Sequence, residues 1–232
     1  MSDVELVVLD DEEAAAAATA ERLAEAARAG AQIALTGGST PRRAYELAAT
    51  REPDWSRAGA WWGDERCVPS DDERSNFRLA RESLLDRLEH RPAVHRIRGE
   101  LDPAEAAADY ERELGDTVLD LVLLGLGPDG HVASLFPGAP TLRERKRRVV
   151  AAAPGLEPFV ERVTLTIPAL SAGRSVLFLV TGAEKAEAVR AAFAEEPSEH
   201  TPASLVRSAT GPTVAVLDRP AAALLGKPLS KT

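Results

Sequence analysis

Short apolar runs alternate with longer stretches of mixed polarity along most of the chain. The runs have the length and composition of β-strands, and the longer stretches place apolar residues at helical spacing. Strands are predicted at residues 4–9, 31–36, 58–62, 93–97, 119–124, 148–152, 162–167, 175–180 and 213–217. Helices are predicted at residues 12–29, 41–49, 77–88, 103–114, 184–194 and 220–225.

This alternation predicts an α/β fold built on a mostly parallel sheet with helices on both faces. The run at residues 119–124 is predominantly apolar, as expected of a strand buried on both sides. Gly30 lies where the first helix should end, and Pro41 and Pro103 lie where helices should begin. We expect residues 1–232 to form one domain, because the length suits a single large α/β unit.

Composition excludes several classes of protein. Hydrophobic residues make up 44% and charged residues 28% of the chain, which is ordinary for a globular protein. The formal net charge of -9 argues against non-specific binding of nucleic acid, which requires a basic surface. No apolar run approaches the ~20 residues that a membrane span needs, and the acidic beginning does not resemble a signal peptide.

The single cysteine, Cys67, permits no disulfide within the chain and fits a reducing compartment. No catalytic partner stands beside it in the sequence, so we interpret it as a bystander. We therefore expect a cytoplasmic protein. A monomer with a small molecule as its partner is our default expectation.

Three polar loops follow predicted strands, and ligands of open α/β sheets bind at the carboxyl ends of strands. The first loop consists of Gly37, Gly38, Ser39 and Thr40 and leads directly into a helix. Glycines allow a ligand to approach the backbone closely, and free N–H groups and hydroxyls at a helix start suit a phosphate. A plain turn with Ser or Thr capping the helix would explain the same residues.

The second loop begins with Gly63, Asp64, Glu65 and Arg66. The planar guanidinium of Arg66 suits a phosphate or carboxylate, and we include Asp64 among the candidate substrate-binding residues. A surface turn held by ion pairs is the alternative. Asn76 follows in the same loop and has an amide that could reach the same cleft, or could instead cap a helix.

The third loop, residues 125–131, has the clearest chemical signal. Its glycines and Pro128 constrain the backbone and bring Asp129 and His131 two residues apart at the end of a buried strand. Histidine suits proton transfer near neutral pH, and an adjacent carboxylate can hold its tautomer and stabilise the cation. A structural histidine is the alternative here, and it is our interpretation of His90, His95 and His200.

Lys185 opens a predicted helix after a strand, where a cation is unfavourable unless an anion is close. It is therefore a candidate phosphate ligand, with a solvated lysine as the alternative. We expect no metal site, because the chain has no HxH, HExxH or cysteine cluster.

Six segments together resemble the 6-phosphogluconolactonase family. They occur in order as LTGGSTP, WWGDERCVP with ERSN, LLGLGPDGHVASLFPG, RVTLTIPAL, TGAEKA and PASLV. The related glucosamine-6-phosphate deaminases have a similar Asp-Gly-His loop that continues to a catalytic Glu. Here the continuation from Val132 to Pro137 contains no acid, which favours the lactonase.

The resemblance implies a Rossmann-like α/β fold and hydrolysis of 6-phospho-D-glucono-1,5-lactone in the pentose phosphate pathway, with no cofactor and no metal. It implies that His131 is catalytic, with Asp129 beside it. It also implies that the loop of residues 37–40, Arg66 and Lys185 bind the substrate, with Arg162 as a further position. An amino-sugar phosphate deaminase and a non-catalytic sugar-phosphate sensor are the alternative functions.

Overall fold

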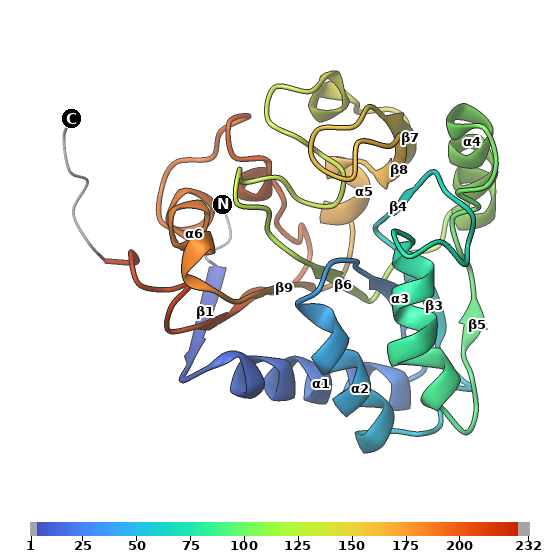
Figure 1. Ribbon diagram of the computed structural model, residues 1–232, viewed down its shortest axis with the longest axis horizontal. Helices are drawn as coiled ribbons and strands as arrows, with labels where there is room; N and C mark the ends of the chain where they lie inside the picture. The colour runs from blue at the N-terminus through green and yellow to red at the C-terminus, as the bar shows by residue number, and fades with distance from the viewer. Residues whose placement is uncertain (1–3, 227–232) are drawn as a thin grey trace.

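The computed structural model describes residues 4–226, which form two sheets (Figure 1). The larger sheet has seven strands, and every neighbouring pair in it is parallel. In spatial order they are β1 (Val4–Leu9), β10 (Thr213–Asp218), β9 (Val176–Val180), β6 (Leu121–Leu124), β2 (Gln32–Leu35), β3 (Gly59–Trp62) and β5 (Ala93–Val94). The smaller, antiparallel sheet has the order β4 (Asp64–Arg66), β8 (Arg162–Leu165) and β7 (Val149–Ala152).

Helices cover both faces of the larger sheet. They are α1 (Glu12–Arg28), α2 (Pro41–Arg51), α3 (Asn76–Ser83), α4 (Pro103–Leu114), α5 (Ile167–Ser171) and α6 (Ala186–Phe193). Short 3₁₀ turns are η1 (Leu85–Arg87), η2 (Pro140–Arg143), η3 (Ala183–Lys185) and η4 (Pro202–Leu205). Figure 1 shows α1 and α2 on one side of the sheet and α5, β7 and β8 on the other. The predicted fold, a mostly parallel sheet with helices on both faces, is therefore confirmed.

Several local predictions differ from the structure. The strand predicted at 162–167 ends at Leu165, α5 at Ile167–Ser171 was not predicted, and the helix predicted at 77–88 ends at Ser83. Residues 64–66, predicted as loop, form β4, because β8 offers them an antiparallel partner that lies far away in the sequence. Residues 220–225, predicted as a helix, form only turns. The strand predicted at 93–97 ends at Val94, because β3 has only two residues, Gly59 and Ala60, in register with it.

The strand order reverses between β2 and β6. From β2 the chain crosses through α2 to β3, whereas from β6 it crosses through the smaller sheet and α5 to β9, in the opposite direction. The loops that leave these two neighbouring strands therefore diverge at their carboxyl ends. Such a point is where open α/β sheets form their ligand-binding crevice.

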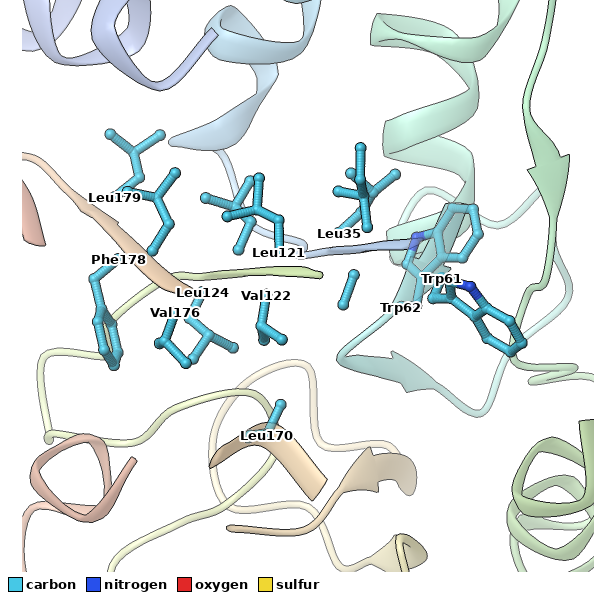
Figure 2. Close-up of a cluster of buried hydrophobic side chains, with 14 of the residues drawn as sticks. Leu35, Trp61, Trp62, Leu121, Val122, Leu124, Leu170, Val176, Phe178 and Leu179 are labelled. Carbon is cyan, nitrogen blue, oxygen red and sulfur yellow. The ribbon is translucent and has the colours of Figure 1, made fainter. Parts of the chain in front are cut away.

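The core lies on both faces of the larger sheet, and every residue of β6 and β9 is buried. Side chains alternate between the faces along each strand. In Figure 2, Leu121 and Leu179 lie on one side of the sheet, and Val122 and Phe178 lie on the side that α5 covers. This double burial explains why the central strands read as nearly continuous apolar runs.

Two buried tyrosines complete the hydrogen bonding at the carboxyl ends of central strands. The hydroxyl of Tyr45 accepts from the Thr36 N–H at 2.9 Å and donates to the Thr36 carbonyl at 2.7 Å. Tyr110 makes the same pair of bonds with Trp62, at 2.8 and 3.0 Å. Each hydroxyl replaces a neighbouring strand where the ladder stops, and so holds the start of a loop in place.

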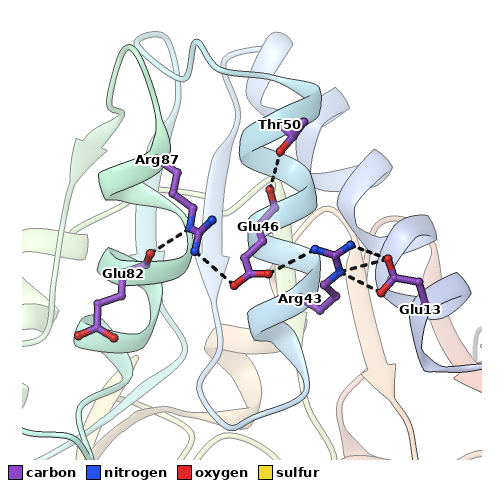
Figure 3. Close-up of polar contacts among 6 residues, drawn as sticks. All are labelled: Glu13, Arg43, Glu46, Thr50, Glu82 and Arg87. Atoms are coloured by element: carbon purple, nitrogen blue, oxygen red, sulfur yellow. Dashed lines mark hydrogen bonds and ion pairs between the residues drawn. The ribbon is translucent and has the colours of Figure 1, made fainter.

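An exposed ion-pair network joins the helices on one face (Figure 3). Arg43 pairs with Glu13 of α1 at 2.7 Å and with Glu46 of its own helix at 3.4 Å. Arg87 of η1 reaches the same Glu46 at 3.4 Å. The arginine lowers the pKa of Glu13 through its hydrogen bond. Because these groups face solvent, we assign the network little weight in stability.

Loss of the buried Tyr110 hydroxyl should lower the free energy of unfolding more than loss of an exposed hydroxyl. Tyr110→Phe leaves the N–H and carbonyl of Trp62 buried without partners, and we expect the free energy of unfolding to fall by about 1–3 kcal/mol. Thr50→Val is the control, because it removes an exposed hydroxyl that donates to the Glu46 carbonyl. It should change stability by less than about 0.5 kcal/mol. Urea denaturation of both variants measures the difference, and equal small effects would contradict this role of Tyr110.

Cys67 should be chemically inert in the folded protein at neutral pH. The side chain is partly buried, and burial, followed by the charges of Glu161, Glu65 and Asp102, raises its pKa to about 11. The reactive thiolate is therefore scarce in the folded protein at pH 8. Alkylation by iodoacetamide should be roughly 100-fold slower at pH 8 than in the urea-unfolded chain, where the thiol has an ordinary pKa. The rate in the folded protein should increase as the pH approaches 11, and equal rates at pH 8 would refute this interpretation.

Candidate functional site

A cleft of about 270 Å³ opens where β2, β6 and β9 end. Its wall includes nearly all the residues singled out in the sequence: Gly37, Gly38, Ser39, Thr40, Asp64, Arg66, Asn76, His131, Arg162 and Lys185. Asp129 lies directly behind the wall and touches His131. The cleft therefore brings together loops from five separate parts of the chain at the point where the strand order reverses.

The loop after β6 folds back on itself to present His131. The Gly127 N–H donates to the His131 carbonyl at 2.9 Å, and the Gly130 N–H donates to the Gly127 carbonyl at 3.0 Å. Gly130 has φ +85°, a left-handed conformation that favours glycine. A Cβ on Gly127 would lie 1.9 Å from Nδ1 of His131, so this glycine allows the ring to pack against the backbone.

Asp129 holds the imidazole from one side. Its Oδ1 lies 2.5 Å from Nδ1 of His131 and also accepts the His131 N–H at 3.2 Å. Burial by itself would raise the pKa of Asp129, but the hydrogen bond and charge of His131 outweigh it and lower that pKa. An ionised Asp129 keeps a proton on Nδ1, which leaves Nε2 as the basic nitrogen. The ring of Phe136 lies 4.8 Å from the imidazole ring.

The other histidines in the sequence lie outside the cleft wall. His95 stacks on Trp61 with ring centroids 3.9 Å apart, and its Nδ1 lies 2.7 Å from Glu113. His90 and His200 are exposed. Among the four histidines, only His131 combines a carboxylate partner with a position in the cleft wall.

Arg66 and Arg162 lie directly opposite each other on β4 and β8. Two like charges in this position repel unless an anion lies between them. Nη1 of Arg66 donates to the Arg74 carbonyl at 2.6 Å, and Nη2 of Arg162 donates to the carbonyls of Leu156 and Pro158. Within residues 4–226, the buried Nε of each arginine has no hydrogen-bond partner. Burial and then the charge of Arg66 lower the pKa of Arg162.

Lys185 adds a third cation to the cleft from the far side. It belongs to η3, which follows β9, and burial lowers its pKa against the opposing charges of Glu184 and Asp129. Lys185 is half-buried, which differs from the solvated lysine that the sequence left as the alternative.

The loop after β2 supplies backbone donors. Gly38 has φ +91°, and Thr40 makes no side-chain hydrogen bond to the start of α2. In the described part of the chain, no hydrogen-bond acceptor faces the N–H groups of Gly38, Ser39 and Thr40. The alternative of a capped turn is therefore wrong for Thr40, and the donors remain available to a ligand in the cleft.

Acidic residues of the second loop are buried, so the alternative of a surface ion-pair turn is wrong for them. Asp64 is 5% and Glu65 2% exposed. Glu65 accepts the N–H groups of Arg66, Asn76 and Phe77, and burial, opposed by these bonds, raises its pKa to about 7. Glu65, which was not among the candidate residues, is the structural centre of this loop. Ser75, and not Asn76, caps α3.

The cleft wall also contains residues that were not named as candidate catalytic or binding residues from the sequence. They are Thr36, Pro41, residues 125–128, Ala133, residues 179–181 and Glu184. Their position in the sequence could have identified them, because they lie at or next to the ends of predicted strands. Among residues 4–226, no three His, Cys, Asp or Glu side chains gather as metal ligands would. The same residues contain no helix with the length and apolarity to cross a membrane.

Comparisons with known proteins identify the family of this chain. Residues 10–215 match the family described as glucosamine-6-phosphate isomerases/6-phosphogluconolactonase. A human 6-phosphogluconolactonase is 40% identical over 218 residues, which cover 88% of this chain and 84% of the relative. The 6-phosphogluconolactonase of Streptomyces coelicolor is 37% identical over 256 residues, which cover 99% and 98% of the two chains.

Solved structures show the same fold. The 6-phosphogluconolactonase from Trypanosoma brucei superposes with a TM-score of 0.88 at 28% identity, covering 97% of this chain and all of the other. A monomeric glucosamine-6-phosphate deaminase shares the fold at a TM-score of 0.81 and 23% identity. With the family match spanning most of its length, this chain belongs to the glucosamine-6-phosphate isomerase/6-phosphogluconolactonase family.

Proposed function

We propose that this protein hydrolyses 6-phospho-D-glucono-1,5-lactone to 6-phospho-D-gluconate, the second step of the oxidative pentose phosphate pathway. One observation supports this most directly: a carboxylate-held histidine lines the same cleft as two arginines whose buried Nε groups have no hydrogen-bond partner within residues 4–226. The histidine suits ester hydrolysis, and the pair of arginines suits a dianionic substrate group. Relatives with this activity in their names match nearly the whole chain.

The phosphoryl group is received by the cationic part of the cleft. Arg66 and Arg162 each offer a buried donor, and a phosphate between them would relieve their repulsion. The free N–H groups of residues 38–40 and the amine of Lys185 provide further donors. Binding energy from this remote group then holds the lactone carbonyl beside His131.

His131 acts as the general base. With Nδ1 held by Asp129, Nε2 takes a proton from water while the water oxygen attacks the lactone carbonyl carbon. The tetrahedral intermediate then breaks its bond to the ring oxygen, and the protonated imidazole returns the proton to that oxygen. Asp129 stabilises the imidazolium between the two steps. The product is the open-chain acid, and no cofactor or metal is required.

We place the protein in the cytoplasm, because its single cysteine fits a reducing compartment, and we take a monomer as its default state. The deaminase alternative needs a carboxylate after the histidine, whereas Leu135 and Phe136 occupy this segment and are buried. Release of ammonia from glucosamine 6-phosphate would support that alternative.

Removal of the imidazole tests the general base. His131→Ala should lower kcat for fresh lactone by about 10²–10⁴-fold after subtraction of spontaneous hydrolysis. Formation of 6-phosphogluconate is followed by a coupled assay, with and without chelator. His90→Ala, at an exposed position, is the control and should leave the rate unchanged. Full activity in a correctly folded His131→Ala variant would exclude His131 from the chemistry, and loss of wild-type activity in chelator would refute the metal-free mechanism.

Removal of a guanidinium tests the phosphate site. Arg66→Ala and Arg162→Ala should each raise KM for the phosphorylated lactone by about 10- to 100-fold, because each removes a charged hydrogen bond. The kinetics with unphosphorylated glucono-1,5-lactone should change little. Arg174→Ala is the control, because Arg174 pairs with Asp120 on the surface. An unchanged KM for the phosphorylated substrate would contradict the assignment.

A further inference from the structure

A series of buried hydrogen bonds joins three segments of the cleft wall, and Asp64 lies at its centre. Its Oδ2 accepts from Oγ of Ser134 at 2.6 Å. Its Oδ1 and its main-chain carbonyl accept from Nδ2 of Asn76, at 3.2 and 2.9 Å. All three residues are at most 5% exposed. These hydrogen bonds connect the start of β4, the start of α3 and the loop that carries His131.

On one side, Asp64 stabilises a strained turn beside the catalytic loop. Ser134 also donates its N–H to Oγ1 of Thr164 on β8 at 3.2 Å, so both of its polar groups are held. The residue before it, Ala133, has φ +50° and lines the cleft. A left-handed alanine costs free energy unless its surroundings impose it. The turn is closed by hydrogen bonds between Val132 and Leu135 and begins directly after His131.

On the other side, Asp64 orients the amide of Asn76. Both acceptors that meet the amide nitrogen belong to Asp64, so the amide oxygen must point the opposite way. That oxygen lies against Gly37, where a Cβ would come within 1.8 Å of it. It is buried and has no hydrogen-bond partner within residues 4–226. Asn76 thus has an unsatisfied buried acceptor directly beside Gly37 in the cleft wall.

We propose that Asp64 is a positioning residue for the reaction: through Ser134 and Asn76 it holds the turn beside His131 and the Asn76 amide of the cleft wall in their active geometry. The inference rests on the proposed lactone hydrolysis. We assign Asp64 to positioning and not to proton exchange, because each of its carboxylate oxygens accepts a hydrogen bond from a neighbouring side chain. A carboxylate would also repel the phosphoryl group, so direct binding of the phosphate is not its role.

Ser134→Ala tests the first connection. It removes the hydroxyl that reaches Asp64 but keeps the backbone N–H that reaches Thr164. Because small misplacements of catalytic groups are costly, kcat should fall by about 10- to 100-fold. KM should change by less than about threefold, because the cationic phosphate site is untouched. An unchanged kcat in the folded variant would overturn the proposal.

Asp64→Asn separates positioning from proton chemistry. The amide oxygen can still accept from Asn76, and the amide nitrogen can donate to the Ser134 hydroxyl, which is able to accept. We expect kcat within about threefold of the wild type and an unchanged pH profile, whereas Asp64→Ala should lower kcat by about 10- to 100-fold. If Asp64→Asn is as damaging as Asp64→Ala and removes a limb of the pH profile, the carboxylate takes part in proton transfer and the proposal is wrong.

Ser208→Ala is the matched control, because Ser208 is 3% exposed and its hydroxyl donates to the Gly173 carbonyl at 2.7 Å, before β10 and away from the cleft. It should lower the thermal midpoint but leave kcat unchanged. If wild-type protein fails to hydrolyse the lactone, the proposed function fails. If the wild type is active and Ser134→Ala loses no more kcat than Ser208→Ala, only the positioning role fails.

Discussion

The parallel pairing of seven strands, of which the central ones are buried on both faces, is the constraint on which this structure depends. It directs the carboxyl ends of all these strands to one edge, where the hydrogen-bond ladder stops and backbone groups need other partners. Tyr45 and Tyr110 supply partners at two of these ends. Where the strand order reverses between β2 and β6, no crossover covers the edge, and the loops form a cleft instead.

Charged groups in the cleft divide into those that the protein satisfies and those that it leaves for a ligand. Asp64 and Glu65 are buried acids whose oxygens are occupied by N–H and O–H donors from nearby loops. Arg66 and Arg162 are the opposite case, with like charges face to face and a buried donor unpaired on each. Such an arrangement is unfavourable in isolation and becomes favourable when an anion binds. In the proposed function, the acids therefore maintain the shape of the site, and the arginines give it selectivity for negative charge.

Local sequence signals identified most of the elements and most of the candidate residues, because these signals act over a few positions. The apolar run of β6, the proline at the start of α2 and the glycines around His131 each constrain their own segment. The same reasoning failed for β4, which is a strand only because β8 pairs with it. Glu65 was also not identified. The residues that donate to it are close in the sequence, but only the fold shows that their N–H groups converge on one buried carboxylate.

The sequence by itself thus determined the class of fold, the loops that carry chemistry and the pairing of Asp129 with His131, since these depend on periodicity, backbone restriction and short spacing. Only the tertiary structure decided which loops share a cleft, that Arg66 faces Arg162, and that Asp64 binds Ser134 seventy residues away. Those contacts depend on strand order and on antiparallel register between distant segments. No local pattern encodes them, because they form only when burial of the whole sheet brings its edges together.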